Sequence, residues 1–394
     1  MGLAGLAGPV LAGRLAAQQP VTRAQAVAAA LLRGARAAFG RADTAGAAAA
    51  LHAARLYPNP SFATSYTQDV PHYHVLATVP LDLPWLRAAR VGAAASARDA
   101  ARLSFAFERA AIRFEVDTTY TRALAALAHA RLSRRTASDA DSLLVMARLR
   151  REVGDVSDLD VRLAEVNAGS LENIATDDSL AALDGLLALQ LAMGLPADTP
   201  TIRLVDSLAP PPDTLPVGAA VPLPVAAATA SLASEARAVT LARRNLFPAP
   251  GLQVGFDAGD PSQPPGLLPT IGLSLALPLF NWNGGEVAQA AAARDRARAN
   301  LDLVERQTAA ERARVERGRA AALARLARDR RLLASADRVA AMALQAYAEG
   351  AVALQNVLEA QRNAREALGR YIDDVAASVD AAAAVRLVSA ADEP

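Results

Sequence analysis

The positions of the prolines constrain the fold of this chain more than any other feature of its sequence. All 23 prolines lie outside two stretches, 85–195 and 279–393. A proline inside a helix removes a hydrogen bond and clashes with the preceding turn, so a helix can run uninterrupted only where proline is absent. Both stretches also have a helix-forming composition throughout. The sequence therefore predicts two very long helical regions and a mainly α fold with a small β part.

The two helical regions belong to a unit that occurs twice. Each is preceded by a Pro-x-Pro motif and a predicted strand pair, and each is interrupted by a glycine turn, near 154 and near 350. Chance similarity of alanine-rich helices does not reproduce this matched order. We expect a first repeat over 20–195 and a second over 226–394, with strand pairs at about 61–81 and 251–279. The proline-rich segment 196–225 is predicted to be an extended connector.

Apolar and small residues inside the helical regions recur with heptad-like spacing, alternately three and four apart, which is typical of coiled coils. Polar residues interrupt these seams. The seam of the last helix comprises Leu354, Val357, Gln361, Ala364, Leu368, Tyr371, Val375, Ser378, Ala382 and Val385. A second seam comprises Leu323, Leu326, Arg330, Leu333, Asp337, Ala340, Leu344 and Tyr347.

Residues 270–279 alternate between an apolar and a small or polar face, with leucine or isoleucine at each odd position. Strands of about ten residues with one apolar face suit a tilted crossing of a bilayer. The alternative is a pair of hairpins packed on a soluble core, but no helix offers a broad bulky face to cover them. Because four strands cannot close a barrel and an open edge cannot lie in lipid, a membrane location requires strands from several subunits.

Composition and motifs exclude several functions. With 41 basic and 40 acidic residues the net charge is +1, so nothing favours nucleic acid. The absence of cysteine excludes disulfides and thiolate metal sites. His72 and His74 lie two apart, but no third metal ligand is evident near them. No nucleotide-binding or hydrolase motif occurs. We expect no catalytic residues, no metal and no cofactor.

Residues 1–19 contain an apolar stretch and an Ala-Ala-Gln end, as export signals do, although the charged start of such a signal is missing. We interpret 1–19 as a signal peptide, and a frayed N-terminal tail is the alternative. No window of roughly 18 uninterrupted apolar residues occurs, which argues against a transmembrane helix.

Three segments in this order resemble the TolC family of outer-membrane efflux proteins. They are LYPNPSF at 56–62, PLFNWNGGE at 278–286, and Tyr347-Ala348-Glu349-Gly350 followed by Asn356-Val357-Leu358-Glu359-Ala360. The resemblance covers about 20–390. The PLFNWNGGE segment looks most like the branch that serves cobalt-zinc-cadmium and copper-silver exporters.

The resemblance implies a homotrimer whose protomers each add four strands to a twelve-stranded outer-membrane barrel, above a helical tunnel in the periplasm. It also implies a periplasmic adaptor protein and an inner-membrane pump of the RND type as partners, and contact with outer-membrane lipid. Such a duct conducts passively and is no enzyme. Heavy-metal cations are our first expectation for its substrate, and small drugs or dyes the second.

The resemblance places a channel constriction at the helix turns. The family pattern of two acids falls on Asn356 and Glu359, so one carboxylate is an amide here, while Asp160 is the equivalent of Asn356 in the first repeat. Like carboxylates around a narrow axis collect cations; the alternative is an ordinary solvated helix tip. Tyr347 matches a tyrosine that holds the family's tunnel closed, but the accompanying arginine would fall on Val352 and is absent.

The helix turns around Gly154, Asp155, Gly350 and Ala351 are where the family meets its adaptor. A soluble periplasmic coiled-coil scaffold or adaptor is the alternative to the duct. It explains the heptads but not the duplicated apolar strand pairs.

Overall fold

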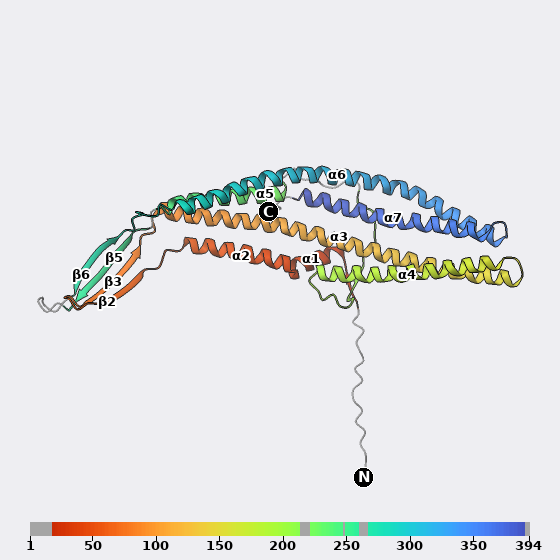
Figure 1. Ribbon diagram of the computed structural model, residues 1–394, viewed down its shortest axis with the longest axis horizontal. Coiled ribbons are helices and arrows are strands. Elements are labelled where there is room, and N and C mark those ends of the chain that lie inside the picture. Colours follow the sequence, from red (N-terminus) through yellow and green to blue (C-terminus); the bar gives the residue numbers. More distant parts are fainter. Residues whose placement is uncertain (1–17, 213–220, 247–248, 260–266, 391–394) are drawn as a thin grey trace, which may run out of the picture. The chain divides into compact units, whose positions relative to one another are not determined.

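The structure, a computed structural model, describes residues 18–212, 221–246, 249–259 and 267–390. Long helices dominate it, and a small sheet accompanies them (Figure 1). The predicted mainly α fold with a small β part is confirmed. Residues 1–17 of the expected signal peptide lie outside the described residues.

Both halves of the chain contain a helical segment, a strand hairpin, a helix of more than sixty residues and a helix of 35 residues. The first half contains α1 (Arg23–Arg33), α2 (Ala35–Arg55), β2 (Ser61–Tyr66), β3 (Tyr73–Pro80), α3 (Pro84–Glu152) and α4 (Asp158–Ala192). The second half contains α5 (Leu223–Arg244), β5 (Gly251–Ala258), β6 (Leu268–Ser274), α6 (Gly284–Ala348) and α7 (Leu354–Val388).

The predicted connector at 196–225 is more structured than its prolines indicate. It contains the short strand β4 (Ile202–Leu204), which pairs in parallel with β1 (Gln19–Val21), and α5 already begins at Leu223. The strand is itself extended, as expected, so among the described residues the expectation differs from the structure only at 223–225, which are already helical. The side chain of Gln190 explains part of this order, because it hydrogen-bonds backbone groups of Pro196, Thr199 and Thr201 and so fixes the segment that leads into β4.

The chain divides into two compact units that do not coincide with the two repeats. The first unit comprises Met1–Ala35, Ile112–Leu215 and Val315–Val385. The second comprises Arg36–Ala111, Pro216–Arg314 and Arg386–Pro394. Each unit therefore combines parts of both repeats: the sheet belongs to the second unit, and the turns of both helical hairpins belong to the first.

The second unit contains a four-stranded antiparallel sheet in the order β2-β3-β5-β6. The two hairpins thus join through β3 and β5, with Val75 opposite Phe256 and Ala77 opposite Val254. Strand β2 at one edge and β6 at the other have no second neighbour in the described part of the chain. All six residues of β2 are exposed.

The register gives the sheet two different faces, because side chains alternate along each strand. One face is mostly apolar and aromatic, and its members include Phe62, Tyr66, Tyr73, Val75, Ala77, Val79, Leu252, Val254, Phe256, Ile271 and Leu273. The other face is mostly polar or small and also contains Leu76 and Leu268. Its polar or small members include Ser61, Ser65, His74, Thr78, Gln253, Gly255, Asp257, Thr270 and Gly272. Ile271 is 78% exposed, so the apolar face is not the cover of a core within the protomer.

Strand β6 is shorter than its pattern of alternation predicts. It ends at Ser274, and Leu275, Leu277 and Leu279 follow outside the sheet although the alternation continues to 279. The reason is that Ser274 pairs with Gly251, the first residue of β5, so no strand remains beside the residues that follow. Pro278 also has no N–H to donate.

Small side chains dominate the buried positions of the helices, which lets helix axes approach closely. Most of the seam predicted on α7 is buried, namely Leu354, Val357, Val375, Ser378, Ala382 and Val385. The seam predicted on α6 is buried at Leu326 and Tyr347 but not at the seam positions between them. No helix among the described residues has both the length and the apolarity to span a membrane.

Candidate functional site

The turns that close the two helical hairpins have the same backbone geometry. After α3, Gly154 has φ +84°, its N–H donates to the Arg151 carbonyl, and the Asp155 N–H donates to the Arg150 carbonyl. After α6, Gly350 has φ +76°, and the N–H groups of Gly350 and Ala351 donate to Tyr347 and Ala346 in the same pattern. This is the Schellman motif, in which a left-handed glycine ends a helix. The predicted turns at 154 and 350 are confirmed.

A cluster of apolar residues joins the two hairpins next to these turns. Its buried members are Leu143, Ala147, Ala164, Tyr347, Leu354 and Val357, from all four helices, and Val161, Val352 and Leu358 pack against it. We call these residues the tip cluster. They belong to one compact unit, so the arrangement is a property of the protomer.

Arg150 connects the hairpins by polar contacts. Its Nη1 donates a 2.7 Å hydrogen bond to the Tyr347 carbonyl, and its guanidinium lies over the Tyr347 ring at 4.8 Å from the ring centroid. Its Nε lies 4.0 Å from a carboxylate oxygen of Asp155, in its own hairpin. The sequence analysis did not identify this residue. Its only local signal is the pair Arg150 and Arg151 in the last turn of α3, which is common at helix ends.

Tyr347, by contrast, was predicted, and it is among the largest fully buried side chains. Its hydroxyl oxygen is buried and makes no hydrogen bond within the described residues. Burial raises the pKa of the phenol, Arg150 acts against this, and the charge of Asp160 adds to it. The tyrosine is therefore held by its ring and carbonyl rather than by its hydroxyl.

Asp160 has a local structural role. The N–H and the hydroxyl of Ser157 donate to its carboxylate at 3.1 and 2.8 Å, and the Asp160 N–H donates back to the Ser157 hydroxyl. This capping box begins α4 at its N-terminus, and part of the carboxylate's hydrogen-bonding capacity is thereby used. In the second repeat Ala353 occupies the position of Ser157, so Asn356 has no such partner.

Asn356 and Glu359 lie three residues apart near the start of α7, and both are exposed. Their neighbours Leu354, Val357 and Ala360 are buried. The two predicted constriction residues therefore lie on the side of α7 that faces away from the protomer's core. Val352, where the resemblance places a missing arginine, packs against the tip cluster.

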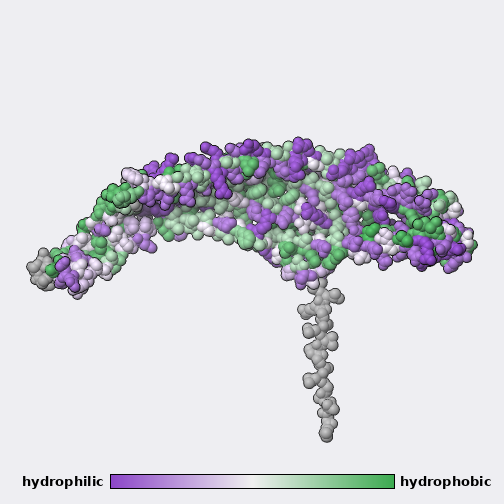
Figure 2. All heavy atoms as spheres, viewed as in Figure 1, coloured by the Kyte–Doolittle hydropathy of each residue, from purple (hydrophilic) through white to green (hydrophobic). Residues whose placement is uncertain are grey.

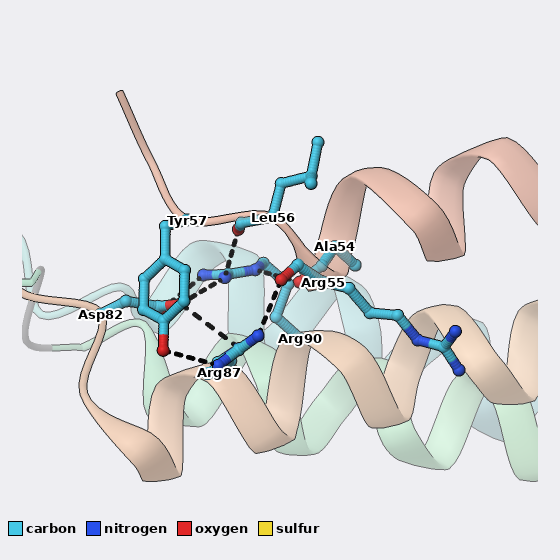
Figure 3. A network of polar contacts seen from close by, with 7 residues as sticks. All are labelled: Ala54, Arg55, Leu56, Tyr57, Asp82, Arg87 and Arg90. Carbon is cyan, nitrogen blue, oxygen red and sulfur yellow. Dashed lines mark hydrogen bonds and ion pairs between the residues drawn. The ribbon is translucent and has the colours of Figure 1, made fainter. Parts of the chain in front are cut away.

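In the second unit, a polar network fixes the start of α3 to the end of α2 (Figure 3). The Asp82 carboxylate is 2% exposed and forms ion pairs with Arg90 at 2.9 Å and Arg87 at 3.7 Å. Arg90 also donates to the carbonyls of Ala54 and Leu56, and Arg87 to the carbonyl of Arg55 and the Tyr57 hydroxyl. The network thus satisfies the carbonyls at the end of α2 and holds the chain segments that enter and leave the first strand hairpin.

The two histidines near the sheet have separate partners. His74 Nδ1 lies 2.8 Å from an Asp257 oxygen and its Nε2 lies 3.1 Å from the Thr67 hydroxyl, while His72 Nδ1 contacts the Thr67 carbonyl at 3.2 Å. No group of three or more potential metal ligands gathers among the described residues.

Figure 2 shows apolar atoms exposed in the sheet region and among the polar residues of the hairpin turns.

The fold is shared with solved outer-membrane channels. It is similar to the outer-membrane protein VceC from Vibrio cholerae (TM-score 0.77, 18% identity, 93% of this chain and 95% of that one). It is also similar to the CmeC outer-membrane channel of Campylobacter jejuni (TM-score 0.78, 15% identity, 99% and 93% of the two chains) and to CusC (0.76, 17%, 93% and 91%). No family model and no curated protein matches the sequence.

Proposed function

We propose that this chain is one protomer of a trimeric outer-membrane duct, through which a tripartite efflux system releases its substrates. The observation that carries the proposal is a fold shared with outer-membrane channels over 93 to 99% of this chain. The sheet supports it independently. Its apolar face is exposed, and within the described residues neither of its edges has a further strand beside it. Such a sheet is stable in lipid only if further strands close it.

In this proposal three copies pair β6 of one protomer with β2 of the next and form a barrel of twelve strands. The apolar face, with tyrosines near its hairpin end, would contact lipid, and the face with His74, Gln253 and Asp257 would line the lumen. The alternative of a soluble scaffold or adaptor is not favoured, because it gives the exposed apolar face no partner.

We propose that the hairpin turns form the periplasmic end of the duct and its gate. Arg150 and the tip cluster would hold the two hairpins of each protomer together. Glu359 and Asn356, exposed on α7, would face the axis, where three Glu359 carboxylates attract cations. Gly154, Asp155, Gly350 and Ala351 are the proposed adaptor contacts.

The partners and the substrate are proposed from the resemblance of segment 278–286. They are a periplasmic adaptor, an RND-type pump, and heavy-metal cations as the first substrate class, with small drugs or dyes as the second. The duct itself would carry no catalytic residue, since the pump supplies the energy.

Fractionation of cells that express the native protein tests the duct. We expect it in the outer-membrane fraction, as a trimer on an unheated detergent gel that becomes a monomer on heating, and we expect it to conduct ions in a planar bilayer. A soluble monomer that is folded without detergent would refute the proposal.

A further inference from the structure

A cavity of about 520 Å³ lies between the two helical hairpins, and all four helices of the hairpins line it. Each helix contributes a leucine to its wall: Leu132 from α3, Leu171 from α4, Leu344 from α6 and Leu368 from α7. Sites for small molecules commonly have this size, and the space between the helices of a bundle is one of their usual places.

The cavity exists because the predicted seams of α6 and α7 do not pack there. No residue of α6 between Leu326 and Tyr347 is buried. Small and polar side chains at four of the six seam positions leave the space unfilled, since they reach less well across it than leucines do. The seam residues that line the cavity are Asp337, Ala340 and Leu344 of α6 and Gln361, Ala364 and Leu368 of α7.

The charges around the cavity favour an anion. Three arginines, Arg135, Arg362 and Arg365, line it together with Asp139 and Asp337. Arg362 forms an ion pair with Glu366 at 2.9 Å, and Arg370 shares that carboxylate. Arg365 is half-buried and has no carboxylate within 4.0 Å among the described residues, although its charge helps to lower the pKa of Glu366. A partly desolvated guanidinium gains most from a carboxylate or sulfonate that it can bind with two N–H groups.

We propose that this cavity binds an amphipathic organic anion, whose apolar body contacts the four leucines and whose anionic group binds Arg365. Leu358 lines the cavity and also packs against the tip cluster. A bound molecule would contact both hairpins and so favour the arrangement in which Arg150 reaches Tyr347. This last step rests on the proposed function, because only in a duct would the bound molecule lower the probability that the channel is open.

The chain has no cysteine, so a single introduced thiol reports on the cavity without background. The test uses Ala364→Cys in the full chain in lipid nanodiscs, with a neutral methanethiosulfonate as reagent and 8-anilinonaphthalene-1-sulfonate as probe. We expect the probe to slow modification about tenfold at saturation. The matched control is Ala327→Cys, on an exposed position of α6 outside the cavity, whose modification rate should not change.

Arg365→Gln in the Ala364→Cys background should abolish the protection. Equal modification rates of Ala364→Cys with and without the probe would refute the binding site. Undiminished protection in the Arg365→Gln variant would refute the proposal that Arg365 binds the anionic group of the probe. Conductance of the same preparation in a planar bilayer separates the two proposals. Conductance without protection refutes the site alone, and protection without conductance refutes the duct alone.

Discussion

Arg150 of α3 lies over the ring of Tyr347 of α6 and donates a hydrogen bond to the carbonyl of the same residue. The carbonyl lies in the last turn of α6, where it also accepts the Gly350 N–H and where a positive charge is favourable. A side chain of the first hairpin therefore adds a second hydrogen bond at the end of α6 in the second hairpin. The arginine expected at 352 is absent, and an arginine from the other hairpin contacts the same tyrosine.

Arg150→Ala should weaken the contact between the hairpins by about 1–2 kcal/mol, the usual range for a cation–π contact together with a charged hydrogen bond. In single-channel recordings we expect longer open times and a larger mean current. Arg151→Ala removes the same charge from an exposed neighbour and is the control. Equal currents in the two variants would show that Arg150 does not hold the two hairpins of the closed duct together.

Gly350→Ala should lower the stability of the hairpin turn by about 1–2 kcal/mol, because its φ of +76° strains any residue with a Cβ. The control lies in the same helix pair: Gly318 is inside α6, and a Cβ there would meet no atom within 4 Å. Gly318→Ala should stabilise by about 0.5–1 kcal/mol. Thermal unfolding followed by circular dichroism measures both effects. Shifts of the melting temperature in the same direction would contradict the left-handed conformation of Gly350.

Glu359→Gln should reduce the preference of the channel for cations, because the proposed ring would lose its three carboxylates. The measurement is the reversal potential across a planar bilayer under a salt gradient. Glu172→Gln removes an equal charge from an exposed position on α4. If the reversal potential changes no more in Glu359→Gln than in this control, Glu359 does not line the constriction.

Asp380 of α7 should make the fold less stable at neutral pH than at pH 4. Burial raises its pKa from 3.8 to about 6, although Arg122 and Arg23 act against this, and one of its oxygens has no hydrogen-bond partner among the described residues. The folded protein thus binds this proton more tightly than the unfolded one. Its contribution to stability is full below pH 3.8 and is lost as the pH rises towards 6.

Asp380→Asn removes that loss. We expect it to raise the stability at pH 7 by about 1–2 kcal/mol, after a discount for the partial exposure of the group, and to have little effect near pH 4. Unfolding curves at both pH values test this. A stabilisation that is the same at pH 4 and pH 7 would mean that the carboxyl does not titrate between them.

Asp82→Asn should destabilise the second unit by about 3 kcal/mol, because Arg87 and Arg90 would lose the buried carboxylate that balances their positive charges. Asp99→Asn is the matched control, since its ion pair with Arg98 is exposed and worth little. Chemical unfolding gives both values. Similar losses in the two variants would show that the network of Figure 3 contributes no more than a surface pair.

Features that depend on neighbouring residues could be predicted from the sequence. Proline-free stretches gave the long helices, and Gly154 and Gly350 marked their ends, because helix formation and termination are local. The capping role of Asp160 could also have been predicted, since Ser157 precedes it by three residues, the spacing of a capping box.

Features that depend on distant residues could not be predicted. The contact between Arg150 and Tyr347 joins residues 197 positions apart, and nothing near either one specifies it. Strand β6 ends at Ser274 because β5 begins at Gly251, which alternation within 270–279 does not reveal. The cavity lies where the heptad pattern continues but most of its residues are small or polar, namely Asp337, Ala340, Gln361 and Ala364.

The unpartnered edges of the sheet have a genetic consequence in the proposed trimer. Each protomer depends on two others to complete the barrel. A variant that still assembles but cannot open should therefore inactivate every mixed trimer that contains it. In a cell that produces equal amounts of both forms, only about one trimer in eight would contain three unaltered subunits. A closed-gate variant should therefore be dominant over the unaltered protein, whereas a variant that fails to fold should be recessive.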